Sequence, residues 1–333
     1  MSLNKYILIT GGAGFIGSHV ATKFFKKGYS ILIVDNLFRG SLKNIESILN
    51  DKRNKFFQLD LLYNSSINEL IKIYEKYYPE IIIHYAAING TQYFYDEPAK
   101  VANVNSIGSY NLLQSLNYFK DKNQKPLICF ASTSEVYGEP FNVPTSESDI
   151  THVRLDMDRD SYACAKLMSE FYFKLSCKEL GIDYQIFRIF NVYGPKMIGT
   201  KYGQVVPEFI SRIINGEYPL KMFGKGNHTR SFCYIDDHVD LTYKLVQSGT
   251  VNEVINLGNP YEISILDLAK EIFNCFEIEP KFDFLNEREG DHLRRSPDIK
   301  KLKEICGNFK FTSLNKGLNN TIKFYRDLKN EKQ

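Results

Sequence analysis

The segment Tyr162-Ala-Cys-Ala-Lys166 places a phenol and an ammonium four residues apart. Residues at this spacing lie on one face of a helix, so a helix here would bring the two groups together. An ammonium beside a phenol is expected to lower the pKa of the phenol, which would let Tyr162 accept a proton from a substrate hydroxyl. The pair also fits an ordinary amphipathic helix, so its chemistry depends on what else the chain places nearby.

Hydroxyls and a carboxylate follow the short apolar run Leu127–Ala131. An apolar run of this length predicts a buried strand. Open α/β sheets bind their ligands at the carboxyl ends of strands, which is where the polar residues would lie. The segment therefore supplies further candidate catalytic residues, namely Thr133, Ser134 and Glu135.

A glycine-rich segment, Thr10-Gly11-Gly12-Ala13-Gly14-Phe15-Ile16-Gly17, follows a predicted strand and opens a predicted helix. Gly11 permits a tight turn, Gly14 lets a pyrophosphate approach the backbone, and Gly17 lets the helix pack closely on the strand. The amides and the dipole of the first helical turn can then hold phosphates. This context predicts a dinucleotide site, whereas a glycine triplet alone would be weak evidence.

Asp35 ends the second predicted strand, 18 residues after Gly17. A carboxylate there can accept hydrogen bonds from both hydroxyls of an adenosine ribose. Its negative charge would repel the 2′-phosphate of NADP, so NAD is the predicted cofactor, although Arg39 is near enough in the sequence to weaken that repulsion. The alternative is a glycine-rich turn followed by a solvated Asp35, and the complete strand–turn–helix–strand context disfavours it.

The elements that would position these residues alternate between short apolar runs and amphipathic stretches. Continuous apolar runs separated in this way are typical of a parallel sheet covered by helices on both faces. The predicted strands are Tyr6–Thr10, Ser30–Val34, Lys55–Leu59, Ile81–Tyr85, Leu127–Ala131 and Tyr184–Ile189. The predicted fold class is therefore α/β, with a Rossmann-type doubly wound parallel sheet and a smaller mixed α/β substrate-binding lobe.

The alternation ends after Gly194-Pro195, where glycine and proline recur and the apolar spacing becomes irregular. We expect residues 1–191 to form an NAD-binding domain and residues 192–330 a substrate-binding lobe. Segments within about 232–258 are expected to return to the first domain, so the boundary is not sharp.

The composition is that of an ordinary globular protein, with 333 residues, 43% of them hydrophobic, and a net charge of +3. Basic residues are interleaved with acidic ones, so no nucleic-acid partner is expected. No apolar run is long enough to span a bilayer, and a strand-like segment begins close to the N-terminus, so neither a membrane partner nor a signal peptide is expected. The six cysteines have neither disulfide nor zinc spacing, and we expect a cytoplasmic protein without a metal site.

Several of these segments together resemble one known family. The combination of GGAGFIG at Gly11, Asp35-Asn36, His84-Tyr-Ala-Ala87, STSEVYG at Ser132 and the Tyr-Lys pair is similar to that of the extended short-chain dehydrogenases/reductases. This family contains nucleotide-sugar epimerases, dehydratases and decarboxylases. The segments Arg188–Pro195 and Arg230–Asp237 resemble the family's RxxNxYGP and RxFxYxxD segments, and the resemblance covers nearly the whole chain.

The resemblance implies a role for each matching residue. Thr133, Tyr162 and Lys166 would form the hydride-transfer triad. The cofactor-binding residues would be Gly11, Gly14, Phe15, Ile16, Asp35, Asn36, Gly40, Asp60, Leu61, Ala86, Ala87, Asn105, Tyr162 and Lys166. The nucleotide-sugar substrate would be bound by Asn89, Tyr93, Asn191, Val206, Arg230 and Arg295.

The resemblance also implies which reaction follows oxidation of the sugar at C4. Sugar 4,6-dehydratases carry an Asp-Glu pair after the threonine, whereas this chain has Ser134-Glu135, which is the pattern of UDP-glucuronate decarboxylases. The segment Arg295-Ser-Pro-Asp-Ile-Lys-Lys301 resembles the RKPDIKK segment of these decarboxylases, whose arginine lies near the substrate carboxylate and C5. Arg294 and Arg295 could together supply that role, or they could bind only the diphosphate.

Decarboxylation is thus the first candidate reaction, and alternatives remain open. The decarboxylases usually carry Ala-Ser-Pro after the fourth strand, where this chain has Ala86-Ala-Ile-Asn89-Gly-Thr-Gln-Tyr93, so another nucleotide sugar and a 4-epimerase reaction stay in consideration. A 4,6-dehydratase is less favoured. A non-catalytic NAD or nucleotide sensor would not need the complete Thr-Tyr-Lys triad. The charged segment Asp156–Asp160 has no interpretation from the sequence.

Members of this family usually pair through two long helices beside the sheet, one of which carries the Tyr-Lys pair. The apolar residues Leu167, Phe171, Phe173 and Leu175 and the stretch Val104–Leu116 are compatible with a homodimer of this kind. The same side chains could equally belong to the core.

Overall fold

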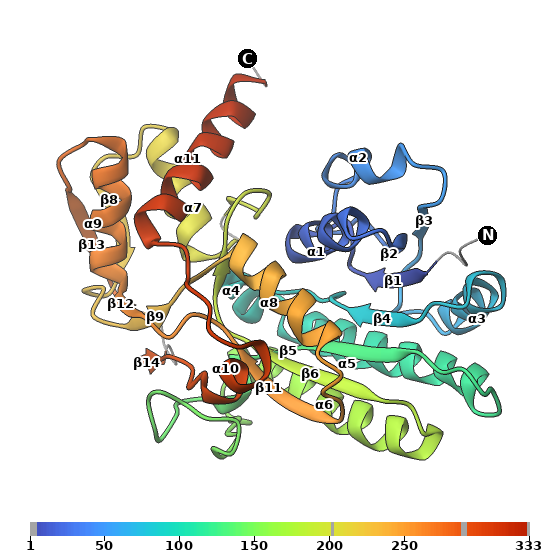
Figure 1. The fold of residues 1–333 in the computed structure, drawn as a ribbon. Coiled ribbons are helices and arrows are strands. Elements are labelled where there is room, and N and C mark those ends of the chain that lie inside the picture. Colours follow the sequence, from blue (N-terminus) through green and yellow to red (C-terminus); the bar gives the residue numbers. More distant parts are fainter. Residues whose placement is uncertain (1–4, 201–202, 288–291, 332–333) are drawn as a thin grey trace.

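The computed structural model describes residues 5–200, 203–287 and 292–331. Within these residues, seven parallel strands form one sheet in the order β11-β6-β5-β4-β1-β2-β3. Figure 1 shows this sheet in the middle of the molecule, with helices on both sides of it. The predicted α/β fold with a doubly wound parallel sheet is therefore confirmed.

The strands of the main sheet agree closely with the predicted apolar runs. They are β1 (Tyr6–Thr10), β2 (Ser30–Asp35), β3 (Lys55–Gln58), β4 (Ile81–His84), β5 (Leu127–Thr133), β6 (Tyr184–Ile189) and β11 (Glu253–Leu257). The order reverses between β1 and β4, and a ligand crevice forms at such a switch point.

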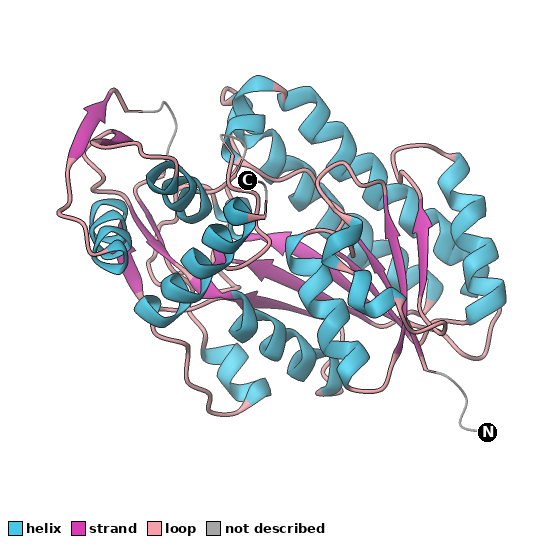
Figure 2. Cartoon of the chain, turned by 90° about the horizontal axis from the view of Figure 1, so that it is seen from above, coloured by secondary structure: helices cyan, strands magenta, loops and turns pink. Residues whose placement is uncertain are grey.

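Helices cover both faces of this sheet and build much of a second lobe (Figure 2). They are α1 (Phe15–Lys26), α2 (Glu46–Leu49), α3 (Ser65–Tyr77), α4 (Thr91–Asp96), α5 (Pro98–Ser115), α6 (Ser161–Leu180), α7 (Val205–Ile214), α8 (Ile235–Gln247), α9 (Ile265–Phe276), α10 (Lys300–Cys306) and α11 (Leu314–Asn330). None of the helices formed by the described residues combines the length and the apolar content needed to cross a membrane.

The main sheet is buried on both faces, which explains why its strands are continuous apolar runs. Successive side chains of a strand point to opposite faces. Ile7 and Ile9 of β1 pack in one core with residues of α1 and α8. Leu8, between them, packs in a second core with residues of α3, α5 and α6.

The residues after β6 build a smaller lobe around α7, α9 and α11 (Figure 1). Its short strands are β7 (Val192–Tyr193), β8 (Leu220–Phe223), β9 (Thr229–Ser231), β10 (Cys233–Tyr234), β12 (Glu262–Ser264), β13 (Phe282–Leu285) and β14 (Arg294–Arg295). Among the described residues they pair as β12-β9-β14, β13-β8 and β10-β7.

The chain returns from this lobe to the main sheet through α8 and β11. The ring of Tyr243 in α8 packs edge-on against Phe24 in α1, with 5.2 Å between the ring centres. β11 pairs with β6 along its whole length, from Glu253 beside Gln185 to Leu257 beside Ile189. The sheet therefore obtains one edge strand from sequence that follows part of the smaller lobe.

Candidate active site

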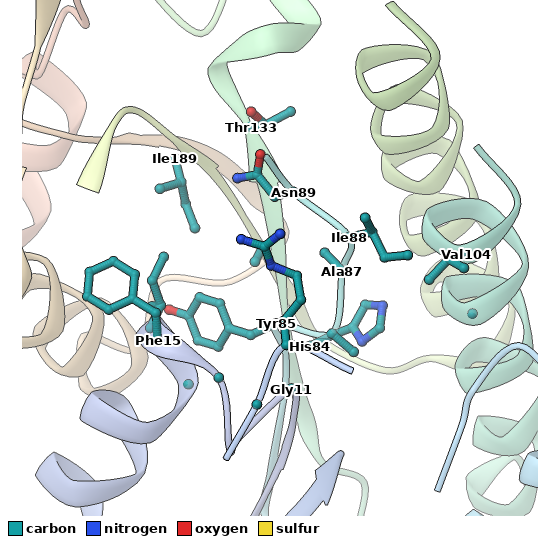
Figure 3. Close-up of a pocket in the computed structure, with 18 of the residues that line it drawn as sticks. Gly11, Phe15, His84, Tyr85, Ala87, Ile88, Asn89, Val104, Thr133 and Ile189 are labelled. Atoms are coloured by element: carbon teal, nitrogen blue, oxygen red, sulfur yellow. The ribbon is translucent and has the colours of Figure 1, made fainter. Parts of the chain in front are cut away.

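A cleft opens at the carboxyl ends of the central strands and brings most of the predicted site residues together. Its lining includes Gly11, Gly14, Phe15, Ile16, Asp35, Asn36, Gly40, Asp60, Leu61, Ala86, Ala87, Asn89, Thr133, Ser134, Glu135, Tyr162, Lys166 and Asn191. In Figure 3, Gly11 lies toward the bottom of this cavity, and Thr133 and Asn89 lie toward its top. Residues from the glycine loop and from the end of β5 thus face one continuous space.

The glycine loop after β1 is shaped by close backbone contacts. Gly11 has a φ of +68°, and a Cβ atom there would lie 2.6 Å from the backbone nitrogen of Ala86. A Cβ atom at Gly17 would lie 2.2 Å from the carbonyl oxygen of Gly11. Gly14 caps α1 without a side-chain hydrogen bond, so the first amides of this helix are available to a phosphate. The loop therefore fits the diphosphate of a dinucleotide.

Asp35 is fixed at the end of β2 by backbone amides. Its Oδ2 accepts a hydrogen bond from the amide of Ala13 at 3.0 Å, and its Oδ1 accepts one from Leu37 at 2.8 Å. Burial raises the pKa of Asp35, and these hydrogen bonds offset only part of the increase. The side chain of Asn36 donates to Asp60 at 2.9 Å, so the residues expected near the adenosine are linked to one another. The set fits the adenosine end of NAD.

Buried polar contacts position the segment that follows β4. The Nδ2 of Asn105 donates to the carbonyl oxygen of Ile88 at 3.0 Å, which fixes this segment beneath α5. The imidazole of His84 hydrogen-bonds with Thr10 at 2.6 Å and with Ser109 at 3.0 Å. Burial holds the pKa of His84 well below its ordinary value, so the ring is neutral and acts as a structural bridge. Asn105 thus supports the cleft from behind.

Tyr162 and Lys166 lie one turn apart on α6, and both side chains are buried. Lys166 Nζ donates to the carbonyl oxygen of Ala131 at 2.9 Å and lies 6.0 Å from the centre of the Tyr162 ring. Thr133, the last residue of β5, forms a hydrogen bond with Tyr162. The Oγ1 of Thr133 also accepts the amide of Glu135 at 3.2 Å. The predicted triad is therefore assembled at one end of the cleft.

The pKa of Tyr162 departs from the sequence-based expectation. Burial raises the pKa of Tyr162 above its usual value, and nearby Glu135 raises it further, while the hydrogen bond with Thr133 opposes the change only in part. Burial also lowers the pKa of Lys166 to about 7, so its charged ammonium form is less populated at neutral pH than that of an ordinary lysine. In the protein alone, low-polarity surroundings thus outweigh the attraction between ammonium and phenolate.

A buried ion pair fixes the end of β5 against its neighbours. Arg188 of β6 binds Glu170 of α6 through two hydrogen bonds of 3.0 and 2.8 Å. Ser132 of β5 donates to the same Glu170 carboxylate at 2.5 Å. These contacts connect β5, β6 and α6 directly beside Thr133. Arg188, the arginine of the RxxNxYGP segment, therefore has a structural role.

Glu135 is bracketed by basic side chains from two other segments. Arg295 Nη1 binds one carboxylate oxygen of Glu135, and the second terminal nitrogen, Nη2, donates to the carbonyl oxygen of Gly138 at 3.1 Å. Arg159 Nη2 lies 3.6 Å from the second carboxylate oxygen, and His292 Nε2 lies 3.7 Å from it. Burial alone would raise the pKa of Glu135, but Arg295 and Arg159 hold that pKa well below its ordinary value.

The predicted substrate-binding residues separate into two groups. Asn89 and Asn191 line the cleft. Among the described residues, the other four predicted ones do not line it: Tyr93, Val206, Arg230 and Arg295. The side chain of Val206 is buried in the hydrophobic core. Arg295 reaches the cleft through Glu135, and Arg230 acts on the charge of Glu135 from farther away.

Two basic residues that lie beside Glu135 were not predicted, Arg159 and His292. Arg159 lies in the segment Asp156–Asp160, three residues before Tyr162, and this short separation is the one signal in the sequence that could have indicated it. Arg39 also lines the cleft, and its guanidinium lies 5.3 Å from the centre of the Tyr93 ring. Arg294, in contrast, is exposed and pairs with Glu262 at 2.7 Å.

Comparison with known proteins identifies the family. The model of the NAD dependent epimerase/dehydratase family matches residues 7–258. This match covers more than half of the chain, and it contains the glycine loop and the complete Thr133, Tyr162 and Lys166 triad. The chain therefore belongs to this family. It is an enzyme, and NAD is its cofactor.

Individual relatives are similar to nearly the whole chain. UDP-glucuronic acid decarboxylase 1 of Xenopus tropicalis is 35% identical over 97% of this chain and 72% of that protein. UDP-N-acetyl-alpha-D-glucosaminuronate decarboxylase of Bacillus cytotoxicus is 32% identical over 99% of this chain and 100% of that protein. The structure of UDP-glucose 4-epimerase from Thermotoga maritima with UDP-glucose is 32% identical, with 97% and 99% coverage and a TM-score of 0.86. The predicted family of nucleotide-sugar enzymes is confirmed.

Proposed function

We propose that this enzyme decarboxylates a UDP-uronate, with UDP-glucuronate as substrate and UDP-xylose as product. The observation that carries the proposal is Glu135, which follows Ser134 at the end of β5 and is bound by Arg295. A 4,6-dehydratase needs an acid at the position of Ser134, and a serine hydroxyl is a poor acid at neutral pH. The decarboxylases of X. tropicalis and B. cytotoxicus support the same reaction.

In this proposal the catalytic work of the chain begins at Tyr162, which takes the proton of the C4 hydroxyl. NAD supplies the acceptor for the C4 hydride and returns that hydride at the end of the cycle. Thr133 holds the C4 oxygen beside Tyr162, because its hydroxyl already hydrogen-bonds with the phenol. Lys166, whose Nζ is fixed by the Ala131 carbonyl, holds the nicotinamide ribose and favours the phenolate when it is charged.

Oxidation at C4 gives a ketone that lies β to the carboxylate on C5. The bond between C5 and the carboxyl carbon then breaks, carbon dioxide leaves, and the C4 oxygen takes up the electron pair as an enolate. A proton from solvent joins C5, which restores the C4 ketone, and Tyr162 gives its proton to the C4 oxygen when this ketone is reduced. Burial raises the pKa of Tyr162, so the phenol keeps the proton taken from C4 between the oxidation and the reduction.

The remaining predicted residues are assigned to the cofactor or to the nucleotide sugar. We propose that residues 1–191, with the returning segments near 232–258, bind the cofactor, and that residues 192–330 complete the substrate site. The cofactor would be held by Gly11, Gly14, Phe15, Ile16, Asp35, Asn36, Gly40, Asp60, Leu61, Ala86, Ala87 and Asn105. The nucleotide sugar would be held by Asn89, Tyr93, Asn191, Arg230 and Arg295, and by Val206 through its backbone only, because the Val206 side chain is buried in the core.

The test is incubation of the purified enzyme with UDP-glucuronate and with UDP-N-acetylglucosaminuronate in separate reactions. Release of carbon dioxide with formation of the matching UDP-pentose or decarboxylated amino sugar supports the proposal. The uronate that is turned over faster identifies the preferred sugar. UDP-glucose and UDP-N-acetylglucosamine are the neutral controls. Turnover of these neutral sugars with no carbon dioxide from either uronate would show a 4-epimerase and overturn the proposal.

We further propose that the enzyme is a cytoplasmic homodimer. Apolar side chains of α5 and α6 are exposed on the outer surface of this helix pair, which supports association of two copies: Ile107, Tyr110, Met168, Phe171 and Leu175. Phe173, predicted for the same surface, is buried in the core instead. Each of the six cysteines, all within the described residues, is a free thiol, which suits a reducing compartment.

A further inference from the structure

Arg159 contacts the catalytic site from a segment that the sequence left without interpretation. It lies in the 3-10 turn Asp158–Asp160, directly before α6, and only 5% of its side chain is exposed. Its Nη2 lies 3.6 Å from one carboxylate oxygen of Glu135, while Arg295 binds the other oxygen. Two guanidinium groups from distant parts of the chain therefore lie within ion-pair distance of the two oxygens of a single carboxylate.

The backbone around Arg159 couples this contact to the base on α6. Asp160 Oδ2 accepts the amide of Arg154 at 2.9 Å, which holds the turn in place. Tyr162 follows Arg159 by three residues and lies in the first turn of α6. Arg159 and Tyr162 therefore approach Glu135 from one short stretch of backbone.

We propose that Arg159 is a positioning residue which, together with Arg295, keeps the Glu135 carboxylate charged and correctly oriented beside Tyr162. This inference rests on the function proposed for the same site and adds a role to it. Glu135 then acts in the reaction as a charged acceptor of hydrogen bonds from substrate or water. It does not supply the proton that joins C5.

The charged groups that face Glu135 keep its carboxyl ionised. Burial would raise the pKa of Glu135, and Arg295, Arg159 and Arg230 together outweigh burial, so that the pKa lies well below its ordinary value. His292 contributes little charge at neutral pH, because burial and the neighbouring Arg295 lower the pKa of His292 to about 3. Tyr162 is the remaining titratable neighbour, and it is neutral in the protein alone. Removal of Arg159 should therefore raise the pKa of Glu135.

The first test compares the pH profiles of decarboxylation for Arg159→Gln and Arg159→Lys. We expect kcat of Arg159→Gln to fall about tenfold at neutral pH with a smaller change in KM, because the C5 region loses its fixed acceptor. The acidic limb of its kcat profile should move upward by about one pH unit. Arg159→Lys should restore most of the rate and the original limb, because it restores the charge.

Arg154→Gln is the matched control. Arg154 lies on the same connection before α6, but half of its side chain is exposed, and it pairs with Asp156 at 2.5 Å. Its profile should match that of the unaltered enzyme. If Arg159→Gln also matches it in rate and in profile, the proposal is overturned. A rate loss with an unmoved acidic limb, equal in the Gln and Lys variants, shows a structural role and also overturns it.

The second test measures Glu135 directly and does not depend on activity. In protein labelled with carbon-13 at the glutamate side-chain carboxyl, the resonance that disappears in Glu135→Gln belongs to Glu135. It should stay at its ionised position down to about pH 4 in the unaltered enzyme and should titrate at higher pH in Arg159→Gln. An unchanged titration in Arg159→Gln overturns the inference. If neither uronate releases carbon dioxide but the resonance moves as expected, the proposed function has failed, while the role of Arg159 toward Glu135 stands.

Discussion

Lys166 is almost fully buried, and burial lowers its pKa from the ordinary 10.5 to about 7. Between these two values the unfolded chain binds a proton at this position that the folded protein does not bind. Stability therefore rises with pH across the window from about 7 to 10.5. Below pH 7 both states carry the proton, and the cost of burying the charge is present in full.

Replacement of Lys166 by Met should abolish this dependence. Without NAD at about pH 7, Lys166→Met is expected to be more stable than the unaltered enzyme, because no charge has to be buried. The difference in the free energy of unfolding should shrink as the pH rises toward 10, and denaturant titrations at several pH values measure it. Lys178→Met, exposed on the same helix, controls for the loss of one charge. A difference that is constant with pH would contradict the prediction.

Replacement of Tyr162 by Phe should test whether Tyr162 is the proton acceptor at C4. Turnover of the nucleotide sugar is expected to fall by about 10²–10⁴-fold, because the proton acceptor at C4 is lost. Affinity for NAD, measured by calorimetry, should change little, since the ring and its packing against Phe94 remain. Tyr172→Phe, partly buried on the same helix, serves as the control and should keep its activity. Full activity in Tyr162→Phe would remove Tyr162 from the mechanism.

The sequence indicates single residues well when their spacing is local. The four-residue separation of Tyr162 and Lys166 requires only a helix, and the structure forms that helix. The contacts of Glu135 with Arg159, His292 and Arg295 depend on how distant segments pack, and no local pattern reports that packing. The direction of the Tyr162 pKa likewise follows from burial, which depends on the whole fold.

At the scale of elements, the loop between β1 and α1 packs so closely against the residues after β4 that no side chain fits at Gly11. Gly11 and Gly28 both have positive φ, at +68° and +91°. A Cβ atom at Gly11 would lie 2.6 Å from the Ala86 nitrogen, whereas a Cβ atom at Gly28 would meet no atom within 4 Å. The two positions therefore share backbone strain and differ only in steric contact.

We expect Gly28→Ala to lose about 1 kcal/mol of stability from its positive φ and to keep its affinity for NAD. Gly11→Ala should lose more stability and at least about tenfold in NAD affinity, because the loop must move away from Ala86. Thermal unfolding and calorimetric titration with NAD measure both effects. Equal losses in the two variants would show that strain, and not close approach, is what the loop requires.

The elements of the main sheet follow from the sequence more directly than those of the second lobe. Strands buried on both faces are continuous apolar runs, so β1 and β6 agree with their predicted bounds. β14 consists only of Arg294 and Arg295, which have no strand-like pattern. This short strand exists because it pairs with β9, and such pairing comes from tertiary structure.

At the scale of the whole molecule, the exposed apolar side chains of α5 and α6 form the surface that we propose as a dimer interface. We expect a dimer in light scattering, and we expect Phe171→Glu with Leu175→Glu to give monomers, because each buried charge would lack a partner. Phe141→Glu is a matched control, since Phe141 is also exposed but lies outside both helices. A monomer for the unaltered enzyme, or a dimer that survives both charges, would contradict the expected interface.

The pairing of β11 with β6 also affects the order of events during synthesis. β6 ends at Ile189, but its outer partner, β11, begins at Glu253. While the chain emerges from the ribosome, β6 therefore presents an unpaired hydrogen-bonding edge until the residues of the smaller lobe up to β11 have been made. This interval is a period of exposure to aggregation, and a fragment truncated after β6 would keep the open edge permanently. The late strand thus ties completion of the main sheet to synthesis of the smaller lobe.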